Sequence, residues 1–256
     1  MLTRSSLFLG LVVCAIGFTG PSTAETWDHI HFSVSDTKAA AEWYAKHFDG
    51  KVTKSGPFDA VWFGTNLVKF KKGEDIGGSD GTKADHVAFS VGDVKGKVEA
   101  LGEDGATVAD ANRRKAGVRY AIDPWGTKIE VMNDADLRGF HHVLIKTTRP
   151  ASTLEFYTTM FGGEVEKFKN VMGVQAIRYN DMYLFVQRAV RPPKSQKGKA
   201  VDHLGWRFKD FDAAVKKMKD AGVKFVVEPR TSGDHKMAFI ESPNGVKIEI
   251  VEDIGH

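Results

Sequence analysis

Histidines recur along this chain at a regular interval. His29, His86, His142 and His203 each lie in a short strand-like stretch. Successive copies are about 60 residues apart, and a period of that length indicates a supersecondary unit repeated along the chain. Neutral imidazole is a common ligand for divalent transition metals. We therefore predict that the four repeated histidines are metal ligands.

Two glutamates recur behind matching turns. Glu130 stands seven residues after Asp123, which opens an Asp-Pro-Trp-Gly turn, and Glu249 stands seven residues after Ser242, which opens a Ser-Pro-Asn-Gly turn. Two imidazoles and one carboxylate form a three-ligand set that suits Fe, Mn, Zn, Ni or Co as a divalent ion. The open positions of such an ion can accept substrate oxygens. The sequence does not select among these metals.

Each repeat is predicted to position its histidine on a strand that is followed by a helix and three more strands. In the first repeat, Asp36 is placed to cap a helix over residues 37–48. Alternation along the first strand sends His29, His31 and Ser33 to one face and the apolar residues between them to the other. We expect the apolar face to pack against the helix and the histidine face to line a concave cup.

The first 24 residues differ from the rest of the chain. Arg4 precedes an apolar run over residues 7–18, and small residues lead up to Ala24, where a signal peptidase would cut. Twelve apolar residues are too few to span a bilayer core about 30 Å thick. Residues 1–24 are therefore predicted to be a secretory signal peptide, and the mature protein is expected to be secreted into the periplasm.

Charge and cysteine content exclude several classes of function. The whole chain has a formal net charge of +3 and 42% hydrophobic residues, which is ordinary for a soluble globular protein. Nothing in it requires a nucleic acid partner, or a membrane once the signal is removed. The only cysteine, Cys14, lies in the predicted signal, so the mature chain has no disulfide and no thiolate ligand. A small-molecule substrate is the partner we expect.

The repeated units resemble the βαβββ modules of the vicinal oxygen chelate superfamily, which includes glyoxalase I, bleomycin-resistance proteins, fosfomycin-resistance transferases and extradiol dioxygenases. The resemblance implies an α+β fold in which four modules pair into two glyoxalase-type half-barrel cups. It implies one such domain over residues 25–134 and a second over residues 139–253, each of two modules, with a homodimer also allowed. The motif positions that carry the ligands in this family match the following residues: His29, His86, Glu130, His142, His203 and Glu249.

The pairing of the modules decides which ligands meet. If neighbouring modules pair, His29 and His86 share a site with Glu130, and the remaining ligands form the second site. If the modules pair crosswise, His29 joins His203 and Glu249 instead. We predict the neighbour arrangement, while the sequence leaves both open.

The family members differ in the residues that they add to these ligands. Glyoxalase I has a further acidic ligand, but the matching positions here are Lys69 and Phe185, so strict glyoxalase I activity is not expected. Extradiol dioxygenases carry a tyrosine ten residues before the glutamate, and Tyr120 matches it. Their upstream histidine is missing in that half, whereas the other half has His235 but Phe239 in place of the tyrosine. Retention of both ligand sets argues against a metal-free, drug-binding protein of the bleomycin-resistance type.

These observations predict a metal-dependent enzyme whose small substrate chelates the ion through oxygens, with lyase, isomerase or dioxygenase chemistry. Tyr120 or His31 is expected to move a proton in the first cup, and His235 in the second. Lys146 and Arg207 are expected to point together into the second cup, which favours an anionic substrate there. The alternative is a non-catalytic protein that binds or sequesters a small molecule.

Overall fold

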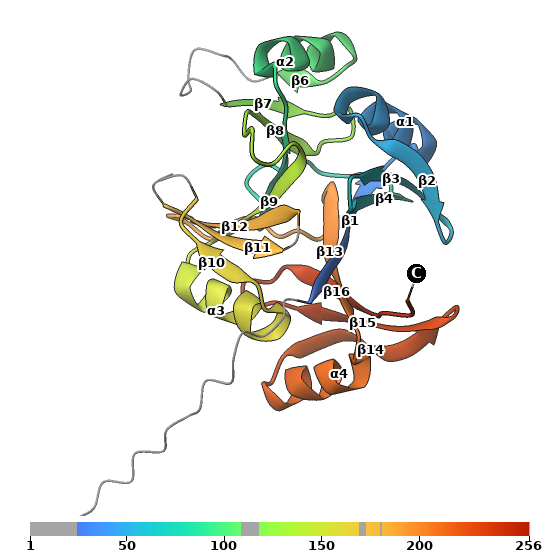
Figure 1. Cartoon of the computed structure of the whole chain (residues 1–256), viewed down its shortest axis with the longest axis vertical. Helices are drawn as coiled ribbons and strands as arrows, with labels where there is room; N and C mark the ends of the chain where they lie inside the picture. Colours follow the sequence, from blue (N-terminus) through green and yellow to red (C-terminus); the bar gives the residue numbers. More distant parts are fainter. Residues whose placement is uncertain (1–24, 109–117, 169–172, 180, 256) are drawn as a thin grey trace, which may run out of the picture.

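A computed structural model of the chain describes residues 25–108, 118–168, 173–179 and 181–255. They form four copies of a module in which a strand, a helix and three further strands follow one another, as the sequence predicts (Figure 1). The predicted signal peptide, residues 1–24, lies outside the described residues. Within the described part of the chain, no helix is long and apolar enough to cross a membrane.

The four modules share the same order of elements. Module one comprises β1 (Thr26–Val34), α1 (Thr37–Phe48), β2 (Lys51–Ser55), β3 (Phe58–Phe63) and β4 (Asn66–Lys72). Module two comprises β5 (Ala84–Ser90), α2 (Val94–Glu103), β6 (Thr107–Val108), β7 (Val118–Ile122) and β8 (Lys128–Met132). Module three comprises β9 (Gly139–Thr147), α3 (Pro150–Phe161), β10 (Glu164–Glu166), β11 (Val174–Tyr179) and β12 (Met182–Arg188). Module four comprises β13 (Val201–Phe208), α4 (Phe211–Asp220), β14 (Lys224–Ser232), β15 (His235–Glu241) and β16 (Lys247–Glu252).

The helices begin where the sequence places their caps. Asp36 accepts a hydrogen bond from the backbone N–H of Ala39 at 3.0 Å, and Asp93 and Asp210 make the equivalent contact at α2 and α4. Each cap satisfies one of the backbone donors left unpaired in the first helical turn. Helix α3 instead begins at Pro150, whose fixed φ and missing N–H suit the first helical position.

Strand pairing between modules is crosswise, so the predicted neighbour pairing is wrong. One eight-stranded sheet has the order β14-β15-β16-β13-β1-β4-β3-β2 and joins modules one and four. The other has the order β10-β11-β12-β9-β5-β8-β7-β6 and joins modules two and three. Each sheet is mixed, because its two central strands are antiparallel to each other while each is parallel to the last strand of its own module. The sheets curve into cups but do not close into barrels.

A short connection accounts for the way the second sheet is assembled. Only residues 133–138 separate β8 from β9, and β9 lies one strand beyond β8, on the far side of β5. Crossing β5 spans about 10 Å, twice the spacing between neighbouring strands, which so short a segment can reach. Modules two and three therefore share a sheet, and the central strand of module one pairs with that of module four.

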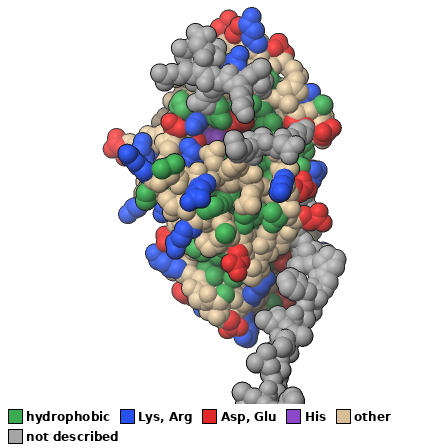
Figure 2. Space-filling view, turned by 90° about the vertical axis from the view of Figure 1, so that its left-hand side faces the viewer, with side chains coloured by type: hydrophobic (Ala, Val, Ile, Leu, Met, Phe, Trp, Pro, Cys, Tyr) green, Lys and Arg blue, Asp and Glu red, His purple; other side chains and the backbone are tan. Residues whose placement is uncertain are grey.

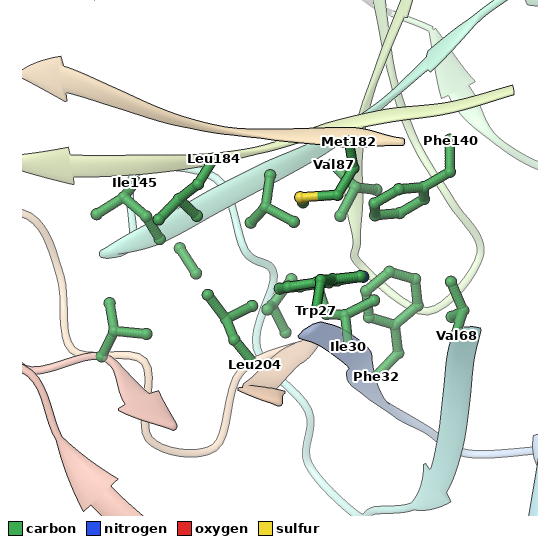
Figure 3. Close-up of a cluster of buried hydrophobic side chains, with 14 of the residues drawn as sticks. Trp27, Ile30, Phe32, Val68, Val87, Phe140, Ile145, Met182, Leu184 and Leu204 are labelled. Atoms are coloured by element: carbon green, nitrogen blue, oxygen red, sulfur yellow. The ribbon is translucent and has the colours of Figure 1, made fainter. Parts of the chain in front are cut away.

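The two sheets share one hydrophobic core. Figure 3 shows apolar side chains of β1 facing those of β5, β9 and β12, with Trp27 and Ile30 on one side and Val87 and Phe140 on the other. This core also contains the apolar stripes of all four helices, which confirms the predicted orientation of the strand faces. The histidine-bearing face of each central strand is consequently turned away from the core and lines the concave side of its sheet.

Modules one and two, like modules three and four, also pack against each other, although their strands are not hydrogen-bonded to one another. Helix α1 contacts α2, and α3 contacts α4. Between modules one and two, the Tyr44 hydroxyl donates to Asp123 at 2.7 Å and the Trp43 indole donates to the Asp104 carbonyl at 2.9 Å. Modules one and two, and modules three and four, thus pack through side chains, whereas modules one and four, and modules two and three, share hydrogen-bonded sheets.

Candidate metal centres

The first group of converging donors, here called the β1/β13 cluster, consists of His29, His31, His203 and Glu249. His29 Nε2 lies 3.4 Å from His203 Nε2. Glu249 Oε2 lies 3.1 Å from the first nitrogen and 3.0 Å from the second. All four residues offer one ligand atom within 4.8 Å of the others.

The second group, here called the β5/β9 cluster, consists of His86, His142 and Glu130. The two Nε2 atoms are again 3.4 Å apart. Glu130 Oε2 lies 3.0 Å from His86 Nε2 and 3.9 Å from His142 Nε2. Tyr120 completes the group, because its hydroxyl donates to the same Glu130 oxygen at 2.7 Å.

Four β-bulges stand directly before the histidines of the two clusters. The pairing of β1 with β13 skips Asp28 and Asp202, and the pairing of β5 with β9 skips Asp85 and His141. In a bulge two residues of one strand oppose a single residue of its partner, which re-aims side chains. Each skipped side chain hydrogen-bonds the ring of the histidine that follows it in sequence: His29, His203, His86 and His142 respectively.

These contacts fix the tautomer of three imidazoles. Asp28, Asp85 and Asp202 lie 2.5, 2.7 and 2.6 Å from the Nδ1 atom of the next histidine. Burial would raise the pKa of each carboxyl, but the hydrogen bonds from the histidines and nearby cations outweigh it and hold the pKa well below its usual range. An ionised carboxylate can only accept, so each Nδ1 must donate. The Nε2 lone pairs therefore face the centre of each cluster.

His142 is oriented by a second histidine rather than by an aspartate. His141 Nε2 lies 3.2 Å from Asp134 Oδ2, and His141 Nδ1 lies 2.9 Å from His142 Nδ1. When His141 donates to Asp134, its other nitrogen is an acceptor for the Nδ1–H of His142. This series of hydrogen bonds leaves the Nε2 lone pair of His142 directed at Glu130. The aspartates orient the other three histidines in the same way.

The donor sets fit a divalent transition metal. Atoms bound to one ion at about 2.1 Å lie about 3.0–3.4 Å apart in octahedral or tetrahedral coordination. The separations of 3.4, 3.1 and 3.0 Å in the β1/β13 cluster fall in this range. Lone pairs of two imidazoles and a carboxylate oxygen repel one another unless a cation or a proton lies between them. Imidazole and carboxylate together suit Fe, Mn, Zn, Ni or Co.

The two histidines of the β5/β9 cluster differ in their affinity for a proton. Burial alone would lower the pKa of His86, but hydrogen bonds to Asp85 and Glu130 raise it above the usual value of 6.5. Burial lowers the pKa of His142 far below that value. Burial would raise the pKa of Glu130, yet the His86 hydrogen bond and the charges of both histidines bring it to about 2. His86 therefore binds a proton more readily than His142 does.

We expect metal binding at the β5/β9 cluster to weaken as the pH falls. A metal must displace the proton of His86, whose raised pKa keeps that proton bound up to a higher pH than an ordinary histidine does. Below this pKa the affinity should drop by about tenfold per pH unit, because one proton competes for each site. Zinc titration calorimetry in buffers of different ionisation enthalpy measures both the affinity and the protons released. An affinity that is equal at mildly acidic and neutral pH contradicts the assignment.

The structure regroups the residues predicted to be catalytic. Tyr120 lies in the β5/β9 cluster, with its ring edge-on to that of His86 at a centroid distance of 5.4 Å. His31 and His235, which were expected in different cups, line the same cavity beside the β1/β13 cluster. His235 belongs to neither group of converging donors, and its Nδ1 lies 3.0 Å from Asp234. His31 and His235 line one cavity because modules one and four share a sheet.

Lys146 and Arg207 do not point into one cup, contrary to the prediction. The Arg207 guanidinium donates to Asp28 and lies at the β1/β13 cavity. Lys146 Nζ donates to Asp85 at 2.7 Å in the other sheet. Both cations thus neutralise the buried carboxylates that orient ligand histidines, which explains how ionised Asp28 and Asp85 are tolerated in the interior.

Sequence reasoning missed the four bulge residues and one glycine. The bulge residues have a sequence signal, because each directly precedes a repeated histidine, but their role depends on a register shift. Gly205 pairs with His29 across β1 and β13, and a Cβ built on it would lie 2.5 Å from the His29 ring. The position accepts no larger residue without moving that ligand.

The two clusters have different surroundings. A cavity of about 720 Å³ borders the β1/β13 cluster and is lined by charged groups that include Lys69, Lys71, Arg230 and Lys247. Beside the β5/β9 cluster the concave face is apolar, and the Phe185 ring stacks on His142 at a centroid distance of 4.0 Å. Figure 2 shows a face on which basic and acidic side chains are scattered among hydrophobic ones, with a histidine visible at the surface.

Comparisons with known families match both halves of the chain. The family described as the Glyoxalase/Bleomycin resistance protein/Dioxygenase superfamily matches residues 139–250. A second family, described as a glyoxalase-like domain, matches residues 29–132. A comparison with curated protein sequences found no match.

Solved structures with the same fold include an enzyme of maize. Glyoxalase I from Zea mays has a TM-score of 0.70 and 19% sequence identity, with 90% of this chain and 92% of that chain covered. A putative dioxygenase from Bacillus subtilis has a TM-score of 0.66 and 14% identity, with 91% of this chain and 86% of that chain covered. At these identities the likeness establishes the fold and not the reaction.

Proposed function

This chain belongs to the vicinal oxygen chelate superfamily, and on that premise we propose that it is a metal-dependent enzyme. Its substrate is a small molecule that chelates a divalent metal through oxygens. The observation that carries the proposal is the convergence, in both sheets, of two imidazoles and one glutamate within 4.8 Å. His29, His203 and Glu249 would hold one ion, and His86, His142 and Glu130 the other.

Each cluster keeps the features that a catalytic centre needs. A bound divalent ion supplies Lewis-acid polarisation of a substrate oxygen and stabilises negative charge that develops on it. The chain itself orients the ligand nitrogens through Asp28, Asp85, Asp202 and His141. Loss of such an orienting partner typically lowers metal affinity about 10–100-fold. The precision of this second layer supports a working centre over a vestigial one.

Tyr120 is the group that we assign to proton transfer at the β5/β9 cluster. Its hydroxyl donates to Glu130 at 2.7 Å and so lies beside the metal ligands. A substrate oxygen placed at the cluster lies within reach of the same hydroxyl, which can then give up or accept a proton. At the β1/β13 cavity the corresponding group is His235, whose ring lies on the lining and is about one-third exposed.

The substrate at the β1/β13 cavity is proposed to be anionic. Lys69 Nζ is largely buried and lies 4.0 Å from Asp28, and burial lowers its pKa. Arg230 lines the same cavity and donates to the Met237 sulfur at 3.5 Å. No carboxylate of the described residues lies within ion-pair distance of this guanidinium. A carboxylate or phosphate on the substrate would find a partner there.

The secreted location remains part of the proposal. The mature protein is expected to begin after Ala24 and to act in the periplasm. N-terminal sequencing of the protein recovered from a periplasmic fraction tests this directly.

Metal analysis combined with a substrate panel tests the proposed activity. Metal removal should abolish turnover of one member of a panel of catechols, 2-oxoaldehydes and epoxides, and divalent metal should restore it, because the substrate binds through the ion. Glu130→Gln should lose metal from the β5/β9 cluster. Tyr120→Phe should keep the metal and lower kcat by about 10²-fold or more, the usual share of a proton-transferring group.

The outcome separates an enzyme from a sequestering protein. Tight binding of a panel member without turnover, unchanged when the metal is removed, would favour the non-catalytic alternative. Elemental analysis of the purified chain serves as the control, since a protein that holds no divalent metal cannot work as proposed.

A further inference from the structure

We propose that His31 is a fourth protein ligand of the β1/β13 cluster. This cluster then holds its metal through three imidazoles and one carboxylate, whereas the β5/β9 cluster uses two imidazoles and one carboxylate. The inference rests on the metal-dependent function proposed above, and it replaces the proton-carrying role that the sequence suggested for His31.

The ring of His31 lies among the other ligands. His29 and His31 alternate on one strand and share its concave face. The His31 ring centroid is 4.5 Å from that of His203 and 5.1 Å from that of His29. One ligand atom of His31 lies within 4.8 Å of those of His29, His203 and Glu249. On its other side the ring packs edge-on against Phe58, at a centroid distance of 4.6 Å.

Both ring nitrogens of His31 lack a hydrogen-bond partner among the described residues. The residue is only 4% exposed, so water does not satisfy them freely. Every other histidine of the two clusters has its Nδ1 atom engaged by the preceding bulge residue. A buried imidazole with two unpaired nitrogens is unfavourable unless something absent from the chain engages it. A cation shared with His29 and His203 does so.

The two sheets differ at this position. His31 is two residues after His29, and the equivalent residue after His86 is Ala88, which has no donor atom. Lys69 pairs with His31 across β1 and β4, whereas Glu130 pairs with Ala88 across β5 and β8. The glutamate of the first sheet comes instead from β16, where Glu249 pairs with Gly205, the residue two after His203. His31 is therefore an additional donor of the first sheet, because Ala88, Leu144 and Gly205 stand at the same interval after the other three histidines and offer no side-chain donor.

An added imidazole changes what the centre can bind. Nitrogen-rich sets favour Zn, Ni and Cu over Mn more strongly than sets with fewer imidazoles do. A six-coordinate ion with four protein ligands keeps two open positions, which is enough for one bidentate substrate. We therefore expect the two clusters of one chain to load in separate steps, with the β1/β13 cluster filled first by late transition metals.

The test uses the full mature chain carrying His86→Ala and His142→Ala, so that only the β1/β13 cluster binds metal. Cobalt(II) affinity is measured by competition with a chelator, and the copper(II) form is examined by electron paramagnetic resonance for coupling to imidazole nitrogens. His31→Phe keeps the aromatic packing on Phe58 and removes both nitrogens. We expect it to lower cobalt affinity by more than about tenfold and to remove one imidazole from the copper spectrum.

A second variant in the same cavity serves as the matched control. His235→Ala should leave the affinity and the spectrum unchanged, because His235 lies outside the group of converging donors. Melting of the metal-free proteins shows whether each variant folds, and His31→Gln provides a second replacement if His31→Phe does not. Equal affinity and an unchanged spectrum after loss of His31 overturn the inference while the proposed function stands. Failure of this parent chain to bind metal overturns the inference alone, whereas failure of the unaltered protein to bind any metal overturns both.

Discussion

A variant that lacks both His29 and His203 should bind as many metal ions per chain as a variant that lacks only one of them. Both imidazoles contribute to the β1/β13 cluster, and a His31→Phe background leaves them with Glu249 as the ligands of that cluster. In this background His29→Ala, His203→Ala and the double variant should each retain one ion per chain where the background protein holds two. His29→Ala combined with His86→Ala should retain none, because these residues lie in different sheets. A site left with one imidazole and one carboxylate binds divalent ions weakly.

Elemental analysis after gel filtration gives the stoichiometry for all four proteins. Neighbour pairing of the modules would reverse the pattern, since His29 and His86 would then share a site and their joint loss would leave one ion. His235→Ala is the control and should keep both ions, because it lies outside both clusters. The measurement thus tests module pairing without determining a structure.

Gly205→Ala should weaken metal binding at the β1/β13 cluster although no ligand is replaced. The new Cβ would lie 2.5 Å from Cε1 and 2.6 Å from Nδ1 of His29, which is closer than such atoms approach. The imidazole must move from its position between Asp28 and Glu249, and both of its ring contacts weaken together. We expect a loss of metal affinity of at least about 10–100-fold, comparable to the loss of an orienting partner.

A second glycine provides the control that separates displacement of His29 from a general effect of a Gly→Ala substitution. Gly92 lies in the turn before α2 with no atom within 4 Å of an added Cβ, so Gly92→Ala should bind metal normally. Cobalt titration of both variants, with circular dichroism of the metal-free forms, gives the comparison. Normal cobalt binding by Gly205→Ala at the β1/β13 cluster would show that His29 is not held where the structure places it.

The local features of the fold were readable from the sequence because they depend on neighbouring residues. Asp36 and the spacing of apolar residues define α1 at the predicted residues 37–48. The family resemblance singled out Tyr120 by its ten-residue interval to Glu130, and the structure pairs the two residues across β7 and β8 with their side chains hydrogen-bonded. Local hydrogen bonding and the spacing of apolar residues are sufficient for the prediction of α1.

There is a physical reason why the pairing of the modules could not be predicted from the sequence. The first strand of every module is apolar on one face and carries histidine on the other, so any two of these strands can pair. Bulges depend on the register between partners, which is why the roles of Asp28 and His141 could not be predicted before the partner strand was known. The unpaired nitrogens of His31 also become visible only when the surrounding rings are in place.

The crosswise sheet order has a consequence for how the protein is made. Modules two and three can complete their sheet as soon as β12 has left the ribosome. Strand β1 is synthesised first but must wait for β13, the partner beside it in the finished sheet, until most of the chain has emerged. Its exposed edge during that interval invites mispairing with other chains. Folding of a chain of this design therefore requires that one edge of β1 stays free until module four has been made.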